Sequence, residues 1–287
     1  MYAILGITGK VGGAVARTLL DVGQSVRAVL RDPAKGETWA ARGCEVAIAD
    51  ITDTAALTTA FTGVEGVFVL IPPIFDPLPG FPEIKAIIAA LSTAIEAASP
   101  PKIVCLSTIG AQTSRPNLLN QLGEVETALG ALPVPVCFLR AAWFMENAAW
   151  DVATARAPGV VPSFLQPLDK PVPMVATADI GQLAAALLRE SWSGRRIVEL
   201  EGPRRVTPND IAATFAEILG RPVQMHAIPR ESWEELFAAQ GMNNPTPRAQ
   251  MLDGFNEGWI SFERGEQGSL KGVTGIETVL RELCRMP

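Results

Sequence analysis

Four closely spaced glycines lie near the start of the chain, in the segment GITGKVGG at residues 6–13. The segment follows an apolar run and precedes a helix-like one, which predicts a strand, a glycine loop and a helix. In such a loop Gly6 permits the tight turn, Gly9 lets the backbone approach a pyrophosphate, and Gly12 lets the helix close on the strand. Free N–H groups at the helix start suit an anion. The feature predicts a dinucleotide site, and a structural turn without a ligand is the alternative.

Strand-like and helix-like segments alternate through the first half of the chain. The strand-like segments are near-continuous apolar runs, as expected when helices cover both faces of a sheet. Repeated strand–helix units favour a parallel sheet with right-handed crossovers. The sequence therefore predicts an α/β fold built on a doubly wound parallel sheet. The expected helices span residues 10–22, 34–42, 54–61, 82–98 and 118–129.

The character of the sequence changes after Arg140. Proline and glycine become frequent in residues 155–173, which favours loops lining a site over further sheet layers. Asp179 stands near the start of an expected helix, where a carboxylate suits the positive helix end. The tail after residue 229 predicts two or three more helices. Further expected elements are helices at 176–190 and 207–220 and strands at 197–202 and 222–229.

These segments predict a nucleotide-binding domain at residues 1–150 and a smaller C-terminal lobe at 151–287. Residues of about 174–200 are expected to return to the first domain. The net charge is −6 with scattered lysines and arginines, so no basic face is expected for nucleic acid. No apolar run approaches the roughly 18 residues of a membrane span. With no leader-like segment ahead of the first strand, the expectation is a cytoplasmic protein without membrane contact.

The cysteines and the single histidine exclude several kinds of site. Cys44, Cys105, Cys137 and Cys284 are far apart and form no CxxC pair, so redox chemistry and a metal cluster are not indicated. The middle two lie in apolar runs and are expected to be buried small hydrophobes. His226 is the only histidine, no GxSxG elbow accompanies it, and its alternating surroundings predict a strand position. We therefore expect no metal.

The end of the second strand selects between the two nicotinamide dinucleotides. An NAD site usually has an acidic residue there, whereas this chain has Leu30 followed by Arg31. A guanidinium grips a 2′-phosphate in a bidentate manner, and Lys10 and Lys35 add positive potential. NADP(H) is therefore favoured over NAD(H). Asp32 would oppose this assignment, unless it only caps the helix that follows it.

Ligands of open α/β sheets bind beyond the carboxyl ends of the strands. At the end of the third strand, Asp50 is suited to the adenine amino group and Ile51 to the adenine face. Further candidates for contact with the cofactor are Leu70, Ile71 and Pro72 at the end of the fourth strand and Ser107 at the end of the fifth. The complete set of expected cofactor-binding residues is Gly6, Thr8, Gly9, Lys10, Val11, Gly12, Arg31, Lys35, Asp50, Ile51, Leu70, Ile71, Pro72 and Ser107.

Segments throughout the chain resemble the NmrA-like family of atypical short-chain dehydrogenase/reductases, which includes bacterial NAD(P)H:quinone reductases. The most specific is the LR-x-x-x-F-MEN pattern at residues 139–147, and the others are GITGKVG, VRAVLRDPAK, VAIADITD, LSTIGA, VATADIGQLAAALL and ELEGPRRVTPNDIAATFAEILGRPV. The resemblance implies a Rossmann domain, a smaller C-terminal lobe and a nicotinamide in the cleft between them. It also implies that the glycine loop, Arg31 and Asp50 serve the cofactor.

The chain departs from ordinary members of that superfamily at the proton donor. Those members reduce carbonyls with a Tyr-x-x-x-Lys pair, but the only tyrosine here, Tyr2, lies in the first strand. Some relatives keep a lysine or histidine four residues before a glutamate that resembles Glu126, and Leu122 occupies that position. The helix contains neither residue type. This difference argues against alcohol–ketone chemistry.

Hydride transfer to a quinone needs less help from an acid, because the product is a phenolate whose pKa is near ~10. The protein then has to hold the nicotinamide against the acceptor and keep water out. The expected pocket consists of Gln112, Trp143, Phe144, Glu146 and Asn147. For the two aromatic residues core packing is the alternative, and for Glu146 and Asn147 it is a role as structural caps.

Two functions fit these features. The first is an NADPH-dependent oxidoreductase that passes hydride directly to a quinone-like acceptor, without flavin or metal. The second is a non-catalytic NADP(H)-binding sensor of the NmrA type, which would act through a protein partner. The aromatic-rich segment from Trp143 to Trp150 favours the enzyme.

Overall fold

The computed structural model describes residues 1–285 and is built around an eight-stranded sheet. The strand order is β12-β10-β6-β5-β4-β1-β2-β3, and every pairing between neighbours is parallel. The chain winds outward from β1 in both directions, so the predicted doubly wound parallel sheet is confirmed. The strands are β1 (Tyr2–Leu5), β2 (Val26–Leu30), β3 (Glu45–Ile48), β4 (Gly66–Val69), β5 (Ile103–Thr108), β6 (Val136–Ala141), β10 (Arg195–Glu201) and β12 (Leu270–Lys271).

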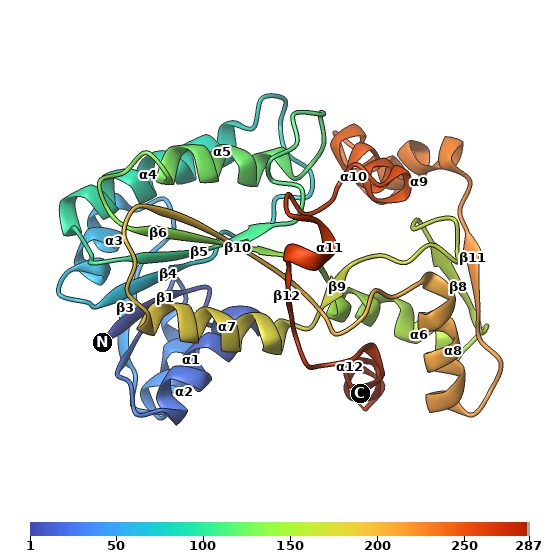
Figure 1. The fold of residues 1–287 in the computed structure, drawn as a ribbon, viewed down its shortest axis with the longest axis horizontal. Helices are drawn as coiled ribbons and strands as arrows, with labels where there is room; N and C mark the ends of the chain where they lie inside the picture. Colours follow the sequence, from blue (N-terminus) through green and yellow to red (C-terminus); the bar gives the residue numbers. More distant parts are fainter. Residues whose placement is uncertain (286–287) are drawn as a thin grey trace.

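Helices cover both faces of this sheet (Figure 1). On one face α1 packs directly on α7, where a Cβ added to Gly181 would lie 2.9 Å from the backbone nitrogen of Val15. Leu57 of α3 and Leu91 of α4 belong to the apolar core on the opposite face, which is distinct from the core under α1. The first face carries α1 (Lys10–Asp21), α2 (Pro33–Ala40) and α7 (Thr177–Arg189), and the other carries α3 (Thr54–Phe61), α4 (Pro82–Ala98) and α5 (Asn120–Leu129).

The central strands are buried on both faces, which explains their unbroken apolar sequences. All four residues of β1 and all four of β4 are buried. Cys105 and Cys137 are fully buried in β5 and β6, as the sequence predicts. Burial raises the pKa of both thiols, and that of Cys137 rises to about 12. Both cysteines therefore pack as small apolar side chains.

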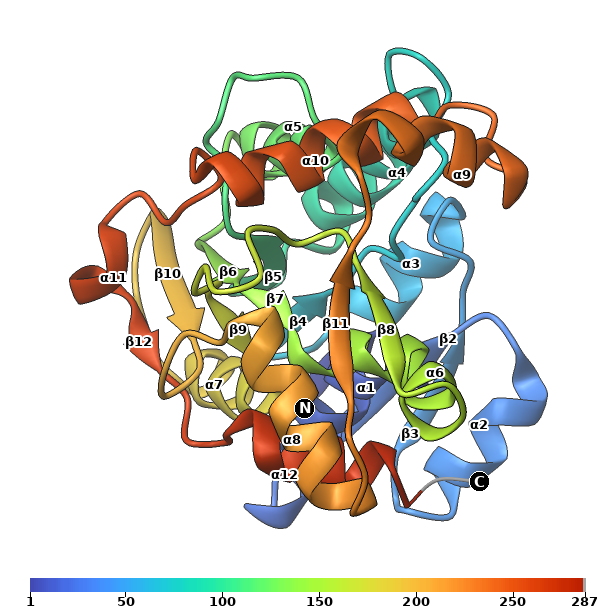
Figure 2. The same ribbon diagram turned by 90° about the vertical axis from the view of Figure 1, so that its right-hand side faces the viewer.

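The elements after β6 that belong neither to the sheet nor to α7 lie beside the sheet and face the viewer in Figure 2, and they are called the C-terminal lobe below. Residues 155–173 were expected to be loops, and this prediction is wrong for β8, which pairs in parallel with β11. His226 lies in β11, as expected. The tail contains four α-helical segments within the described residues, one more than predicted. The elements of this region are β7 (Trp143–Phe144), η1 (Met145–Asp151), α6 (Val152–Arg156), β8 (Val160–Ser163), β9 (Met174–Val175), α8 (Pro208–Leu219), β11 (Gln224–Ala227), η2 (Arg230–Ser232), α9 (Trp233–Ala239), α10 (Thr246–Glu257), α11 (Gly265–Gly268) and α12 (Ile276–Leu283).

The chain returns twice from the C-terminal lobe to the sheet. β10 pairs with β6 along six residues, and β12 then pairs with β10 at the sheet edge. Asp179 of α7 is 4% exposed and accepts hydrogen bonds from the backbone N–H of Thr274 (2.9 Å) and from its hydroxyl (2.7 Å). This buried carboxylate fastens the segment after β12 to the helix that covers α1.

None of the helices between residues 1 and 285 combines the length and the apolar character needed to cross a membrane. In the same residues, no three histidine, cysteine, aspartate or glutamate side chains are grouped so that they would hold a metal ion.

Candidate functional site

The glycine loop connects β1 to α1 in a conformation that requires glycine. Gly6 has a φ of +68°, and its carbonyl accepts a hydrogen bond from the Gly9 N–H at 2.9 Å. A Cβ added to Gly12 would lie 2.6 Å from the carbonyl carbon of Gly6, closer than side chains approach a backbone. Gly9 is the N-cap of α1, and no side chain caps that helix. The loop therefore brings uncapped helical N–H groups to the carboxyl edge of the sheet, which fits a pyrophosphate.

The expected residues at the ends of β1 and β4 lie together. A Cβ at Gly6 would be 3.0 Å from Cδ2 of Leu70, so the segment after β4 packs against the glycine loop. Val11 is buried under the loop, whereas Thr8 and Lys10 are exposed above it. Of the two residues that follow Leu70, Ile71 is buried and Pro72 is exposed.

The ends of β2 and β3 bring a guanidinium and a carboxylate close together. Thr52 donates to Asp50 through its hydroxyl (2.6 Å) and its backbone N–H (2.9 Å). These hydrogen bonds, with a smaller contribution from the positive charge of Arg31, hold the pKa of Asp50 below its usual value. Within residues 1–285 the exposed Arg31 forms no hydrogen bond or ion pair of its own. Its guanidinium therefore lies free beside the expected adenosine region.

The remaining residues of this edge differ in their exposure and contacts. Lys35 is exposed and Ile51 is half-buried. Asp32 accepts a hydrogen bond from the backbone N–H of Ala34 at 3.1 Å and is the N-cap of α2. The capping role considered for Asp32 is thus present, so this carboxylate is engaged at the helix start.

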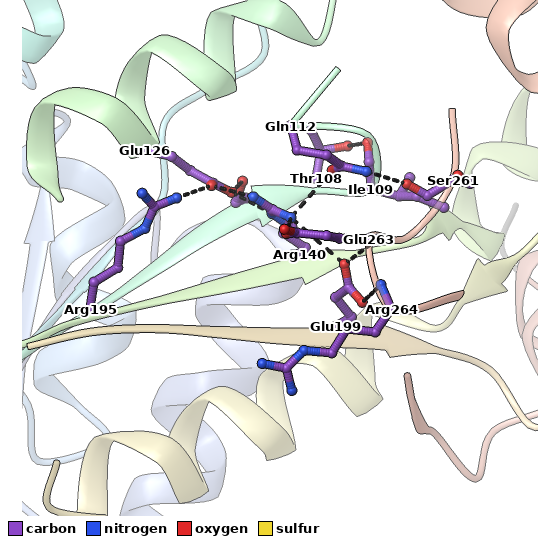
Figure 3. Close-up of polar contacts among 11 residues, drawn as sticks. Thr108, Ile109, Gln112, Glu126, Arg140, Arg195, Glu199, Ser261, Glu263 and Arg264 are labelled. Carbon is purple, nitrogen blue, oxygen red and sulfur yellow. Dashed lines mark hydrogen bonds and ion pairs between the residues drawn. The ribbon is translucent and has the colours of Figure 1, made fainter. Parts of the chain in front are cut away.

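A buried polar network joins the ends of β5 and β6 (Figure 3). Glu126 of α5 is 3% exposed and accepts two hydrogen bonds from Arg140, at 2.8 Å from Nε and 2.7 Å from Nη2. The Ser107 hydroxyl donates to the same carboxylate at 2.6 Å, and Arg195 donates at 3.2 Å. Burial alone lowers the pKa of Arg140, but hydrogen bonds with Glu126 and Glu263 outweigh it and raise that pKa.

The network continues into the C-terminal lobe (Figure 3). Nη1 of Arg140 donates to Glu263 at 2.8 Å and lies 3.7 Å from the buried carboxylate of Glu199. Glu199 in turn accepts the backbone N–H groups of Glu263 (2.8 Å) and Arg264 (3.1 Å). Gln112 donates to the carbonyl of Ser261 at 2.8 Å and accepts from Arg140 at 3.3 Å. The network therefore fastens residues 261–264 to the sheet.

Two of the expected site residues, Ser107 and Gln112, form hydrogen bonds within this network. Ser107 is 4% exposed, and its hydroxyl proton points to Glu126. Gln112 bridges the sheet and the C-terminal lobe. Arg140 and Glu199 were missed as functional residues by sequence reasoning. The available signal was the single charged residue Arg140 within the otherwise apolar strand VCFLRA, whereas Glu199 lies in RRIVELE, which carries four charged residues and singles none of them out.

The segment after β6 carries the expected pocket residues. Trp143 packs edge-to-face on Phe255 of α10, with 5.2 Å between the ring centroids, and Phe144 pairs with β9. One oxygen of Glu146 accepts from the backbone N–H (2.9 Å) and hydroxyl (2.5 Å) of Thr177, at the start of α7. The cap considered for Glu146 is thus present, while its other oxygen is buried without a hydrogen-bond partner in the described chain.

The position at which the family resemblance implies a lysine or histidine in some relatives carries no proton-donating group here. The sequence of α5 is NQLGEVETAL, in which Leu122 precedes Glu126 by four residues. Leu122 packs against the apolar core. Tyr2 lies in β1 and is 4% exposed. Asn147 is half-buried in η1, next to the capping Glu146.

The doubly wound parallel sheet and its glycine loop define a Rossmann-type α/β protein. The model of the NmrA-like family matches residues 2–261, so the chain belongs to this family.

Named relatives cover most of the chain. The NAD(P)H azoreductase of Xenophilus azovorans is 28% identical over 244 residues, which cover 84% of this chain and 82% of that protein. Quinone oxidoreductase 2 of Escherichia coli is 28% identical over 254 residues, or 88% of this chain and 85% of that protein. A solved structure described as a new type of NADPH-dependent quinone oxidoreductase from Escherichia coli has a TM-score of 0.79 at 25% identity. It covers 98% of this chain, and 99% of its own length is matched.

Proposed function

We propose that this protein is an NADPH-dependent oxidoreductase that transfers hydride directly to a quinone or a similar conjugated acceptor. The relatives are named as an NAD(P)H azoreductase and as quinone oxidoreductases, which confirms the expected class of NAD(P)H-dependent oxidoreductase. The observation that carries the proposal for this chain is the loop at the end of β1, where Gly12 leaves no room for a Cβ.

The cofactor site we propose follows the carboxyl edge of the sheet. The uncapped start of α1 would hold the pyrophosphate, with Thr8 and Lys10 exposed beside it. Arg31 would bind the 2′-phosphate, because its guanidinium is exposed and forms no other ion pair in the described residues. Asp50 beside it, with its lowered pKa, would remain ionised and accept hydrogen bonds from the adenosine.

The acceptor site we propose lies between the glycine loop and the segment after β6. A bound nicotinamide supplies the hydride. Trp143 and Phe144 would exclude water from that transfer and hold the acceptor ring. The network would hold the Ser107 hydroxyl and the Gln112 side chain in place on one side of this site. We propose that the hydride passes directly, without a flavin or a metal.

The lack of a proton donor on α5 favours an acceptor that stabilises negative charge itself. With Leu122 at the donor position, an alkoxide product would receive no proton from this helix. A reduced quinone carries its charge as a phenolate with a pKa near ~10, and bulk water suffices as the later proton source. Quinones and related conjugated acceptors therefore fit the site better than simple ketones.

Turnover measured with the purified protein tests this function. The protein is mixed with NADPH and a panel of quinones, and the nicotinamide absorbance is followed. Loss of turnover in Gly9→Val, whose side chain would press on the Gly6 carbonyl 3.3 Å away, would assign the reaction to the glycine site. Tight NADPH binding without turnover of any acceptor would contradict the enzyme and support a redox sensor of the NmrA type that acts through a protein partner.

A further inference from the structure

One arginine differs from the others that are at least partly buried. Among the described residues, five of the arginines that are not exposed form an ion pair with a carboxylate. The sixth, Arg248 of α10, forms none. The paired arginines are Arg27, Arg140, Arg196, Arg205 and Arg230.

The surroundings of Arg248 are apolar. Its guanidinium lies over the ring of Phe237, 4.2 Å from the centroid, and that ring is fully buried. Its polar contact within residues 1–285 is with the thioether sulfur of Met242, at 3.6 Å, and a thioether is a weak acceptor. Burial lowers the pKa of Arg248, and no nearby acidic group offsets that effect. Glu234 on the neighbouring helix is engaged instead by Thr246 (3.2 Å) and Arg230 (3.9 Å).

A guanidinium that is partly withdrawn from water without a counter-charge loses some of its hydration and gains no ion pair in return. Five N–H donors in a planar fork need acceptors, and the thioether satisfies at most one of them. In the other five arginines of this kind the protein supplies a carboxylate. The exception at Arg248 therefore indicates a place where an anion is supplied from outside the chain.

The start of α10 lies where the C-terminal lobe meets loops from the carboxyl edge of the sheet. The carbonyl of Pro247 accepts a hydrogen bond from the N–H of Leu118, in the loop after β5, at 2.9 Å. Just before α10, the N–H of Asn244 donates to Asp76, in the loop after β4, at 2.7 Å. Both views show α9 and α10 on the same side of the sheet as α4 and α5 (Figures 1 and 2). Arg248 thus follows a segment that contacts the loops after β4 and β5, at the edge of the sheet where we propose the acceptor site.

Helix geometry relates Arg248 to the pocket itself. Phe255 follows it by seven residues, or two turns, so both side chains project from one face of α10. Phe255 packs on Trp143, which belongs to the proposed acceptor pocket. With a rise of 1.5 Å per residue, the two positions are about 10 Å apart along the axis. This is the span of a two-ring aromatic molecule that carries one substituent.

We propose that Arg248 is the anion-recognising residue of the acceptor site and selects aromatic acceptors that carry a sulfonate or carboxylate. The acceptor ring would lie against Trp143, and its oxyanion would take both arms of the guanidinium fork. This inference rests on the proposed function, since it assigns the acceptor class of the same site. The protein carries a net charge of −6, so a local cation is needed to attract an anionic acceptor.

A neutral quinone and its sulfonated counterpart distinguish recognition of the anion by Arg248 from a general effect of this residue on turnover. NADPH-dependent reduction of 1,4-naphthoquinone and of 1,4-naphthoquinone-2-sulfonate is measured for the wild-type protein, Arg248→Gln and Arg248→Lys. In Arg248→Gln we expect kcat/KM for the sulfonate to fall roughly 10- to 100-fold, the range of a charge-assisted hydrogen bond, mainly through KM. The neutral quinone should change by less than about 2-fold. The lysine variant should recover part of the loss, because it keeps the charge without the fork.

The matched control is Arg115→Gln. Arg115 also lies over an aromatic ring, that of Trp259 at 5.3 Å, but it is exposed and lies 3.8 Å from Glu257. This variant should leave the preference between the two quinones unchanged. Melting temperatures of all variants show whether they fold. Equal sensitivity of both quinones to Arg248→Gln, or an unchanged preference, would overturn the inference.

A binding measurement distinguishes failure of this inference from failure of the proposed function. If the wild-type protein reduces neither quinone, the proposed reaction is wrong. Binding of 2-naphthalenesulfonate, measured by titration calorimetry with wild type and Arg248→Gln, then decides the role of Arg248. A roughly 10-fold weaker affinity in the variant supports the anion site, and equal affinities refute it.

Discussion

Replacing Glu126 with glutamine removes the charge at the centre of the buried network in Figure 3. The carboxylate accepts hydrogen bonds from Ser107, Arg140 and Arg195. Its side chain is 4% exposed and that of Arg140 is 2% exposed, so water does not replace the lost partner. The amide of the variant would also point an N–H group at donors that need an acceptor.

The loss of stability in Glu126→Gln depends on the carboxylates that remain near Arg140. Removing one partner of a buried ion pair costs about 3–5 kcal/mol. Arg140 retains Glu263 at 2.8 Å and lies 3.7 Å from Glu199, so its charge is not left without compensation. We therefore expect the lower end of that range, about 3 kcal/mol. For a chain of this size, each kcal/mol lowers the melting temperature by roughly 2 °C, which predicts a decrease of about 6 °C.

Glu263→Gln is the matched control, because it removes the same charge from the other end of the same guanidinium. The Glu263 side chain is 55% exposed, and exposed ion pairs contribute about 0–1 kcal/mol. Its melting temperature should fall by no more than about 2 °C. Differential scanning calorimetry of the two variants and the wild type compares them directly. Equal decreases, or a larger one for Glu263→Gln, would refute the idea that burial at Glu126 makes this network stabilising.

Three further predictions concern the cofactor site and acid stability. Arg31→Ala should weaken NADPH binding roughly 10- to 100-fold and NADH binding by less than about 2-fold, as measured by titration calorimetry; equal losses would contradict the 2′-phosphate assignment. Gly12→Ala forces α1 away from Gly6, whose carbonyl carbon is 2.6 Å from the added Cβ, so NADPH binding should be lost. Unchanged affinity would refute the assignment of the glycine loop as the pyrophosphate site. Burial opposes ionisation of Glu201, but hydrogen bonds, led by that from Lys271, lower its pKa. Its contribution to stability is therefore present above about pH 4.3 and is lost as pH falls through its lowered pKa. The melting-temperature gap between wild type and Glu201→Gln should shrink between pH 5 and pH 3, and a constant gap would refute this.

Much of the fold is readable from the sequence because its determinants are local. The helices at Thr54–Phe61 and Pro82–Ala98 begin and end where they were expected. Asp53 caps the first at the Ala56 N–H, and proline occupies the first position of the second. β8 was missed because its four residues are too few to show alternation and lie next to Gly159, with Pro162 inside the strand.

The candidate site also has a part that could be predicted from local sequence and a part that depends on contacts between distant residues. The glycine loop was readable because its steric requirements lie within seven residues, Gly6 to Gly12. The network was not, because the partners of Arg140 are distant in the chain: Glu126 is 14 residues away and Glu263 is 123 residues away. Arg248 gave no signal in the sequence, since its distinctive property is the absence of a carboxylate partner that the other partly buried arginines of the described chain have.

The late return of β10 and β12 to the sheet limits how this protein can be taken apart. A fragment that stops at residue 150 would expose the edge of β6 along six residues and strip α7 from α1. A fragment of residues 1–150 would therefore lack two strands of the sheet, and a chimera that exchanges acceptor preference with a relative would need at least two junctions, one on each side of β10. Loop-by-loop grafting onto an intact scaffold is the practical route to new specificity.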